Sequence, residues 1–363
     1  MRIIVLGGTG NFGARIVRSL CNDPTIELLV ANRHAASVPG ADQVKSVMLD
    51  VESADFPRSL RQLSPELVIH SVGSFQGQDY RVASAALDAG AHYFDLADGR
   101  QFVADFAGKM NEKAFEAGRV ALAGVSSLPA LSSAVIEHLR RGLSSIDSIE
   151  VIIAPAQRAP RGRATVEAVF SYLGRPFPVW REGKWRRAWG WMDLRRIRLD
   201  IGRRFGAACD VPDLALFPLR FRGVQNVTFH AALEFRAQHL ALWSLAALRR
   251  IGLPFPVGHW AVALADWTGW LNLVAGDRGG MSVTVTGNRG PGDRVRRTWE
   301  LAAAAMDGPE IPSMPVTVLA RKFARGEIPP SGAFACVGFL TLADFAPEFA
   351  HWRMTERTTE SPA

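Results

Sequence analysis

The sequence predicts an α/β protein in which a doubly wound parallel sheet is followed by a second domain of the α+β class. Three observations predict this fold. Short apolar runs alternate with amphipathic stretches in the first third, a glycine-rich turn follows the first run, and the alternation stops after Gly124. The length of 363 residues exceeds what one hydrophobic core usually serves, so two domains are expected.

The apolar runs of the first third are predicted to be strands, at 3–6, 26–31, 44–49, 67–71, 92–95 and 120–123. Helical patterns lie between several of them, at 13–20, 80–89 and 102–117. Gly90 and Gly118 follow two of these patterns, in the position where glycine ends helices. Strand and helix in alternation indicate a parallel sheet with helices on both faces.

The second domain is predicted to begin after a Ser/Pro-containing turn at 125–129. Its expected strands include 149–154, 224–229 and 281–286, and its expected helices include 238–248 and 257–275. We therefore divide the chain into a first domain at 1–124, a second at 125–308, and a C-terminal segment at 309–363. The tail after Trp352 is predicted to be disordered.

Composition argues against a disordered chain, a disulfide-stabilised scaffold and a zinc protein. Hydrophobic residues at 48% and charged residues at 21% are typical of a folded globular chain. The three cysteines have no paired or metal-like spacing, which predicts neither disulfides nor a metal site and favours a reduced, cytoplasmic compartment. The first apolar run is too short for a signal peptide, so export is not expected.

The net charge of +7 is concentrated in the window 175–204, which holds ten basic residues against three acidic ones. Four tryptophans interleave it: Trp180, Trp185, Trp189 and Trp191. Such a segment can bind nucleic acid, an anionic membrane surface or an acidic substrate. We favour a twisted β meander with tryptophan inside and arginine outside, because the aromatic residues fall largely at alternating, strand-like positions. No nucleic-acid module accompanies the window, so no nucleic-acid partner is expected, whereas contact with a membrane surface stays open.

A dinucleotide-binding motif follows the first strand. The residues Gly8-Thr9-Gly10-Asn11-Phe12-Gly13 match G-x-G-x-x-G, and Gly7 extends the run. The glycines allow a tight turn and a close backbone approach to a pyrophosphate, which the helix N-terminus then faces. The motif predicts a Rossmann domain, although a turn that merely joins strand to helix would look similar.

The end of the second strand favours NADP over NAD. An NAD enzyme should carry an acidic residue there for the ribose hydroxyls, but this chain has Asn32 and Arg33. A guanidinium suits a 2′-phosphate that a carboxylate would repel, unless Arg33 is only a surface arginine. The other predicted cofactor contacts follow the third and fourth strands: Asp50 and Val51 near the adenine, and Ser71, Val72 and Gly73 near the nicotinamide.

The fifth strand carries the predicted catalytic residues, Asp95 and Tyr93. At the carboxyl edge of the sheet, Asp95 can hold a substrate ammonium or relay a proton, with Tyr93 as donor. Equally, Asp95 can cap the following helix while Tyr93 packs in the core. His92 alternates to the other face and is expected to be structural.

Two expectations concern the second domain. Arg163 and Thr165, near the start of a helix, offer either an anion site or a plain helix cap. The stretch 258–275 is predicted to be an amphipathic helix that lies against protein, a dimer partner or a membrane surface. It is not expected to span a bilayer, because Asp266 lies in its middle.

The chain resembles the saccharopine dehydrogenase-like oxidoreductases. The similar segments are 7–13, 90–97, 124–129, 161–165, 279–281 and 307–309. The resemblance implies an NADP-binding Rossmann domain, a central domain with a curved sheet for substrate contacts and often a dimer surface, and a C-terminal segment that returns to the first domain.

The family's activities include reduction of amino-acid-derived imines and of lipid-linked compounds. The resemblance thus implies an NADP-dependent oxidoreductase, working as a reductase on a small imine or carbonyl compound or on a lipid-attached one. The alternatives are a non-catalytic NADP-binding sensor or scaffold, and a peripheral membrane protein that uses the basic window.

Overall fold

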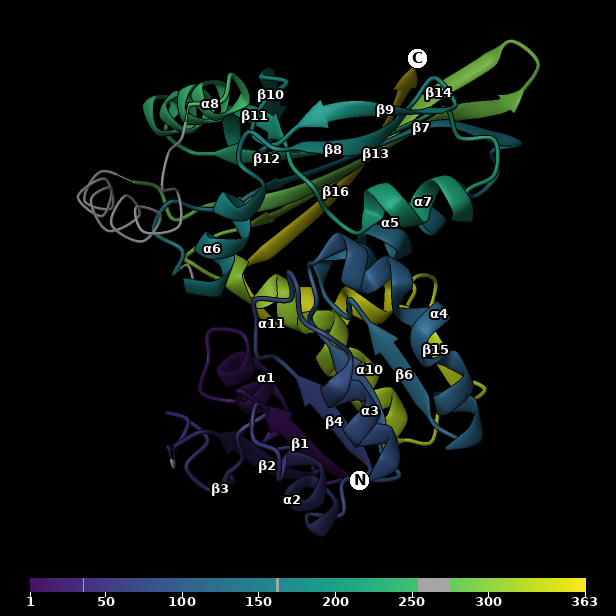
Figure 1. Cartoon of the computed structure of the whole chain (residues 1–363). Coiled ribbons are helices and arrows are strands. Elements are labelled where there is room, and N and C mark those ends of the chain that lie inside the picture. Colours follow the sequence, from purple (N-terminus) through teal and green to yellow (C-terminus); the bar gives the residue numbers. More distant parts are fainter. Residues whose placement is uncertain (35, 161–162, 254–274) are drawn as a thin grey trace. The chain divides into compact units, whose positions relative to one another are not determined.

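The computed structural model describes the chain except residues 35, 161–162 and 254–274 (Figure 1). The described residues divide into two compact units. Unit 1 comprises Met1–Leu131 and Glu310–Leu340, and unit 2 comprises Ser132–Pro309 and Thr341–Ala363. Each unit has its own sheet, as the two predicted fold classes require.

Unit 1 contains a seven-stranded parallel sheet with the order β15-β6-β5-β4-β1-β2-β3. Its strands are β1 (Arg2–Leu6), β2 (Glu27–Asn32), β3 (Lys45–Met48), β4 (Leu67–His70), β5 (His92–Asp95), β6 (Val120–Ala123) and β15 (Gly332–Ala335). Every residue of β4, β5 and β6 is buried, which explains the continuous apolar residues of 67–69 and 120–123.

Helices cover both faces of this sheet. They are α1 (Gly13–Leu20), α2 (Phe56–Gln62), α3 (Arg81–Asp88), α4 (Arg100–Glu116) and α10 (Met314–Ala324), with a short helical turn η1 (Ser127–Leu131). In β5, Tyr93 stacks on Phe106 of α4, whereas the next residue, Phe94, packs on Phe323 of α10. Neighbouring residues of one strand thus face different helices, which confirms the doubly wound arrangement.

Unit 2 contains a nine-stranded mixed sheet. Its main order is β10-β11-β12-β7-β13-β14-β16. In addition, β8 pairs with β12, and β9 pairs with β8. The strands are β7 (Ser145–Ala154), β8 (Pro176–Arg181), β9 (Lys184–Trp189), β10 (Arg195–Leu199), β11 (Gly202–Ala208), β12 (Asn226–Leu233), β13 (Gly279–Gly290), β14 (Asp293–Ala303) and β16 (Met354–Pro362). Parallel pairing of β12 with β7 is combined with antiparallel neighbours, as expected for the α+β class.

The helices of unit 2 are α5 (Ser132–Leu139), α6 (Arg163–Tyr172), α7 (Asp213–Arg220), α8 (Arg236–Arg250), α11 (Ala346–His351) and the short turn η4 (Leu342–Phe345). A further turn, η3 (Gly308–Ser313), crosses the boundary between the units in the sequence. The amphipathic helix predicted at 258–275 lies outside the described residues except for Ala275. Within the described ranges, every helix is too short or too polar to cross a membrane.

The C-terminal segment differs from its prediction. The tail after Trp352 is not disordered, because residues 354–362 form β16 and pair with β14. The indole N–H of Trp299 donates to Glu356 Oε2 over 2.9 Å, which fixes this pairing. The segment 309–363 is therefore split, with Glu310–Leu340 in unit 1 and Thr341–Ala363 in unit 2. Pairing with β16 also protects β14 from being a long exposed edge.

The basic window forms strands, as the meander interpretation predicted, but its tryptophans are only partly inside: Trp191 is buried, whereas the tryptophans of the β8–β9 hairpin are not fully buried. Phe177, Val179 and Ala188 are the buried side chains of the β8–β9 hairpin, whereas Trp185 is 47% exposed. Trp180 packs edge-on against Trp185 and donates its indole N–H to the Val224 carbonyl oxygen over 2.8 Å. Only the smaller apolar residues alternate inward on this hairpin.

Candidate functional site

The strand order of unit 1 creates a switch point between β1 and β4. The chain runs from β1 outward to β2 and β3, then returns to β4 on the other side. The loops that follow β1 and β4 therefore meet at the carboxyl edge of the sheet. A Cβ atom added to Gly7 would lie 2.9 Å from Val72 Cγ2 and 3.2 Å from Ser71 Oγ. In open α/β sheets, ligands bind at this point.

The glycine turn packs closely against its own backbone and against the loop after β4. Gly7 has a φ of +74°, and a Cβ atom on Gly13 would lie 2.2 Å from the Gly7 carbonyl oxygen. Ser71 Oγ donates to the Leu6 carbonyl oxygen over 2.7 Å and ties the two loops together. No side chain caps the N-terminus of α1, and its first turn carries no acidic residue. The backbone N–H groups at this N-terminus can therefore receive a phosphate.

The end of β2 presents two cationic or hydrogen-bond-donating groups. Asn32 Oδ1 accepts hydrogen bonds from the Thr9 backbone N–H over 3.2 Å and from the Thr9 hydroxyl over 3.0 Å. Because both groups of Thr9 donate, the amide atom that faces Thr9 is the oxygen, and the donor Nδ2 points the other way. Within the described part of the chain, this buried Nδ2 has no hydrogen-bond partner. The exposed Arg33 follows directly.

The remaining predicted cofactor residues have local partners. Asp50, two residues beyond β3, accepts a hydrogen bond on Oδ1 from the Glu52 N–H over 3.1 Å. The loop after β4 is held by Gln78, whose Nε2 donates to the Val72 carbonyl oxygen over 2.9 Å and to the Ser74 carbonyl oxygen over 2.8 Å. Contacts of Asp50 and Val51 with adenine, and of Ser71, Val72 and Gly73 with nicotinamide, stay predictions.

Asp95 and Tyr93 are both fully buried. Asp95 Oδ1 accepts backbone N–H groups from Gly124 over 2.8 Å and Ala97 over 2.9 Å, which joins the ends of β5 and β6. Burial raises the pKa of Asp95 to about 7, against the lowering effect of these N–H groups and the Tyr93 hydroxyl. The helix α4 begins after Gly99, so Asp95 is not its cap. Through these contacts Asp95 holds the loop after β5 against the end of β6. Its catalytic role stays a prediction.

His70 completes this buried group and was not among the predicted site residues. Its Nδ1 lies 2.9 Å from the Tyr93 hydroxyl, and burial lowers the pKa of His70 to about 3. The imidazole is therefore neutral at physiological pH. The available sequence signal was a histidine at the end of an apolar strand, directly before Ser71. By contrast, Nδ1 of His92 accepts the Val120 N–H on the other face, in agreement with a structural role.

A second polar pair was also missed at the carboxyl edge. Gln76 Nε2 donates to Asp98 Oδ1 over 3.2 Å, and these residues follow β4 and β5 respectively. In unit 2, the predicted anion site at Arg163 and Thr165 falls on side chains outside the described part. Among the described residues, no three His, Cys, Asp or Glu side chains are grouped as metal ligands.

Solved structures share this architecture. Apo saccharopine dehydrogenase (L-Glu forming) from Saccharomyces cerevisiae matches with a TM-score of 0.66 at 12% identity, over 99% of both chains. The chain has the saccharopine dehydrogenase fold. Homospermidine synthase from Legionella pneumophila, solved with NAD, matches with a TM-score of 0.64 at 12% identity, over 99% of this chain and 91% of that one.

A third structure with the saccharopine dehydrogenase fold is an engineered D-amino acid dehydrogenase bound to NADP+. Its TM-score is 0.50 at 17% identity, over 96% of this chain and 98% of the other. No protein-family model matches the sequence, and a search of curated proteins finds no match. The structural likeness confirms the fold predicted from the motif segments.

Proposed function

We propose that the chain is an NADP-dependent oxidoreductase that reduces a small imine or carbonyl compound, or the same group on a lipid-attached molecule. Three observations support this function: the glycine turn at the switch point, the uncapped N-terminus of α1, and a fold shared with a homospermidine synthase solved with NAD and a D-amino acid dehydrogenase bound to NADP+. The pair Asn32 and Arg33 carries the choice of NADP, because a free amide donor and a cation replace the carboxylate typical of NAD enzymes.

The residues fit this cofactor in unit 1. When bound, NADPH supplies the hydride. Gly7, Gly8 and Gly13 let the turn pack tightly against β2, the loop after β4 and its own backbone, and the N–H groups at the start of α1 would receive the pyrophosphate. The donor Nδ2 of Asn32 and the guanidinium of Arg33 can then hold the 2′-phosphate.

Titration of the protein with NADPH and NADH tests the proposal. We expect the native chain to bind NADPH at least about tenfold more tightly than NADH. Arg33→Ala should weaken NADPH binding by about 1–3 kcal/mol, the loss expected for a charge-assisted hydrogen bond, and change NADH binding little. The matched control is Arg222→Ala, which removes an exposed arginine from unit 2 and should change neither affinity.

Two results would count against this function. Equal affinity for NADPH and NADH in the native chain would contradict the NADP assignment. Tight NADPH binding without oxidation by any compound in a broad carbonyl and imine panel would instead favour the sensor interpretation.

A further inference from the structure

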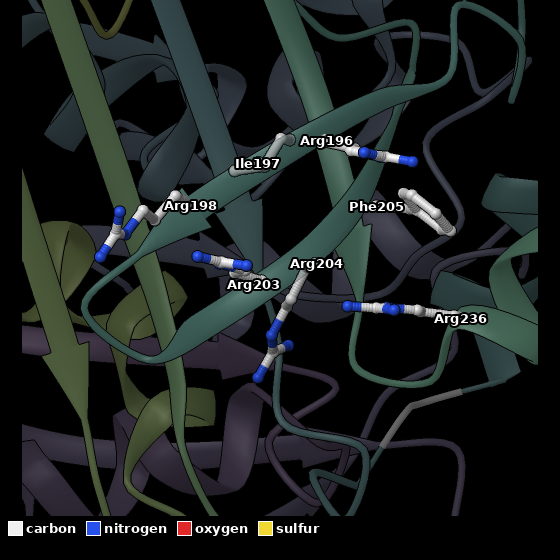
Figure 2. Close-up of a pocket in the computed structure, with 7 residues that line it drawn as sticks. All are labelled: Arg196, Ile197, Arg198, Arg203, Arg204, Phe205 and Arg236. Atoms are coloured by element: carbon white, nitrogen blue, oxygen red, sulfur yellow. The ribbon is translucent and has the colours of Figure 1, made fainter.

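A pocket of about 400 Å³ opens in unit 2, at β10, β11 and the start of α8 (Figure 2). Five arginines line it, together with Ile197 and Phe205: Arg196, Arg198, Arg203, Arg204 and Arg236. We call it the arginine pocket. Its volume falls in the range of small-molecule sites, roughly 300–1,000 Å³.

The hairpin under the arginine pocket places like charges opposite each other. In the register of β10 and β11, Arg198 pairs directly with Arg203, and Arg196 pairs with Phe205. Residues two apart on a strand share a face, so Arg196, Arg198 and Arg203 lie on one side of the hairpin. Like charges directly opposite each other destabilise a sheet. This arrangement lowers stability unless an anion neutralises it.

Neighbouring arginines of the same basic window are neutralised by carboxylates. The ion pairs are Arg181 with Asp193, Arg186 with Glu182, and Arg195 with Glu150. The exposed arginines of the pocket differ, because across the described part of the chain none of them has an ion pair or a hydrogen bond: Arg196, Arg198, Arg203 and Arg236. Their charge is therefore available to a ligand.

The inner part of the pocket is held in place by the protein. Arg204 is 5% exposed and donates to the carbonyl oxygens of Pro155 over 2.7 Å and Arg278 over 2.9 Å. Arg236 extends from the first turn of α8, with its guanidinium carbon 5.7 Å from the centre of the Phe205 ring (Figure 2). Strands and a helix carry these groups, so the pocket is formed before a ligand arrives.

We propose that the arginine pocket binds a small molecule bearing phosphate groups with two or more negative charges, such as a phosphate ester or a pyrophosphate. Planar guanidinium groups bind phosphate oxygens in a bidentate manner, and three of those that line the pocket, on Arg196, Arg198 and Arg203, lie on one face of the hairpin. Phe205 and Ile197 add apolar surface for the rest of the ligand. A free metabolite and a lipid headgroup both supply this chemistry. The site does not depend on the proposed oxidoreductase function.

Calorimetric titration of the full chain with inorganic pyrophosphate, at fixed ionic strength, tests the site. We expect submillimolar binding that Arg198→Ala weakens at least about fivefold and Arg203→Glu abolishes. The matched control is Arg187→Ala, an exposed arginine of β9 in the same window but outside the pocket. It should leave the affinity unchanged. Equal weakening by Arg187→Ala would overturn the proposal in favour of a diffuse basic surface.

Thermal unfolding separates loss of a site from loss of the fold. Without ligand, Arg198→Ala should melt at the native temperature or higher, because one member of a like-charge pair is gone. The upward shift that pyrophosphate gives the native chain should be smaller in this variant at the same pyrophosphate concentration. A variant that melts lower and still shifts as far as the native chain would contradict the site.

Two further arms identify where the phosphate binds and its source. Because the glycine turn of unit 1 also faces phosphate, the titration is repeated with NADPH. Binding that NADPH removes and Arg203→Glu does not would place pyrophosphate in unit 1 and overturn the proposal.

Phosphatidylcholine vesicles with and without phosphatidate test a lipid headgroup. Sedimentation with phosphatidate that pyrophosphate reverses supports the pocket, whereas sedimentation that pyrophosphate leaves unchanged contradicts it. Binding to duplex DNA that is tighter than binding to pyrophosphate, and that Arg187→Ala weakens as much as Arg198→Ala does, also contradicts the proposal.

Discussion

Asn32 is the residue on which cofactor choice most depends, because its Oδ1 is engaged by Thr9 while its Nδ2 stays free. Asn32→Asp keeps the acceptor for Thr9 and replaces the free donor with a second carboxylate oxygen. We predict that this variant binds NADH better and NADPH at least about tenfold worse, since a carboxylate pairs with ribose hydroxyls and repels a 2′-phosphate. Fluorescence titration with both cofactors measures the change. Retained preference for NADPH would show that Asn32 does not face the ribose.

Asp95 is expected to act on stability through the two N–H groups that it accepts. Asp95→Ala leaves the buried N–H groups of Ala97 and Gly124 without their acceptor, and we predict a loss of about 2–4 kcal/mol in the free energy of unfolding. Asp95→Asn keeps an acceptor oxygen and should lose less than about 1 kcal/mol. Urea unfolding of both variants gives these values.

The same pair of variants decides the predicted catalytic role. A folded Asp95→Asn protein that keeps turnover rules out proton transfer by this carboxylate. A folded variant with a loss of about 100-fold or more would support it, because general acid–base catalysis contributes on that order.

The turn between β1 and α1 is the element whose shape we expect cofactor binding to require. An alanine at position 13 would place Cβ 2.2 Å from the Gly7 carbonyl oxygen and 2.8 Å from Ser71 Oγ, so the backbone must move. We predict that Gly13→Ala lowers the free energy of unfolding by at least about 1–3 kcal/mol and NADPH affinity more than tenfold. Chemical unfolding and cofactor titration measure the two effects.

Gly108 provides a matched control for this element. It is exposed in the middle of α4, and a Cβ atom there would meet nothing within 4 Å. Gly108→Ala should therefore stabilise the chain by about 0.5–1 kcal/mol, through helix propensity, and leave NADPH binding unchanged. If Gly13→Ala and Gly108→Ala destabilised the chain equally, the glycine turn would have no special need for glycine at position 13.

Across the whole molecule, buried ionisable groups set the pH dependence of stability. Burial lowers the pKa of His70 to about 3 and of His92 and His239 to about 4, from 6.5. As the pH falls, these histidines are protonated in the unfolded chain at a higher pH than in the folded chain. The free energy of unfolding therefore decreases below pH 6.5. Burial raises the pKa of Asp95 and Asp213 to about 7, from 3.8, so stability is lost as the pH rises toward 7.

These opposing effects predict a maximum of stability near pH 6.5. Between pH 4 and 6.5 the three histidines favour a rise of stability with pH, whereas the buried carboxyls oppose it, among them Asp98, whose pKa burial also raises. Each uncompensated proton changes stability by at most about 1.4 kcal/mol per pH unit. Above pH 6.5 only the carboxyls titrate, and stability should decline slightly. Urea unfolding at pH 5, 6.5 and 8 tests this. A free energy of unfolding that rises steadily from pH 5 to pH 8 would contradict it, and Asp213→Asn should reduce the decline above pH 6.5.

Local features of the sequence determined the elements of unit 1 and the position of its glycine turn. The predicted helix at 13–20 and strands at 92–95 and 120–123 have the observed bounds, because their apolar periodicity and flanking glycines act over a few residues. The glycine turn, Asn32 and Arg33 were recognisable for the same reason. Tertiary structure alone decided the contacts between distant segments. It placed β15 beside β6, paired β16 with β14, and joined Asp95 to Gly124. Such pairings depend on which strands become neighbours in a sheet, and no short stretch of sequence encodes that choice.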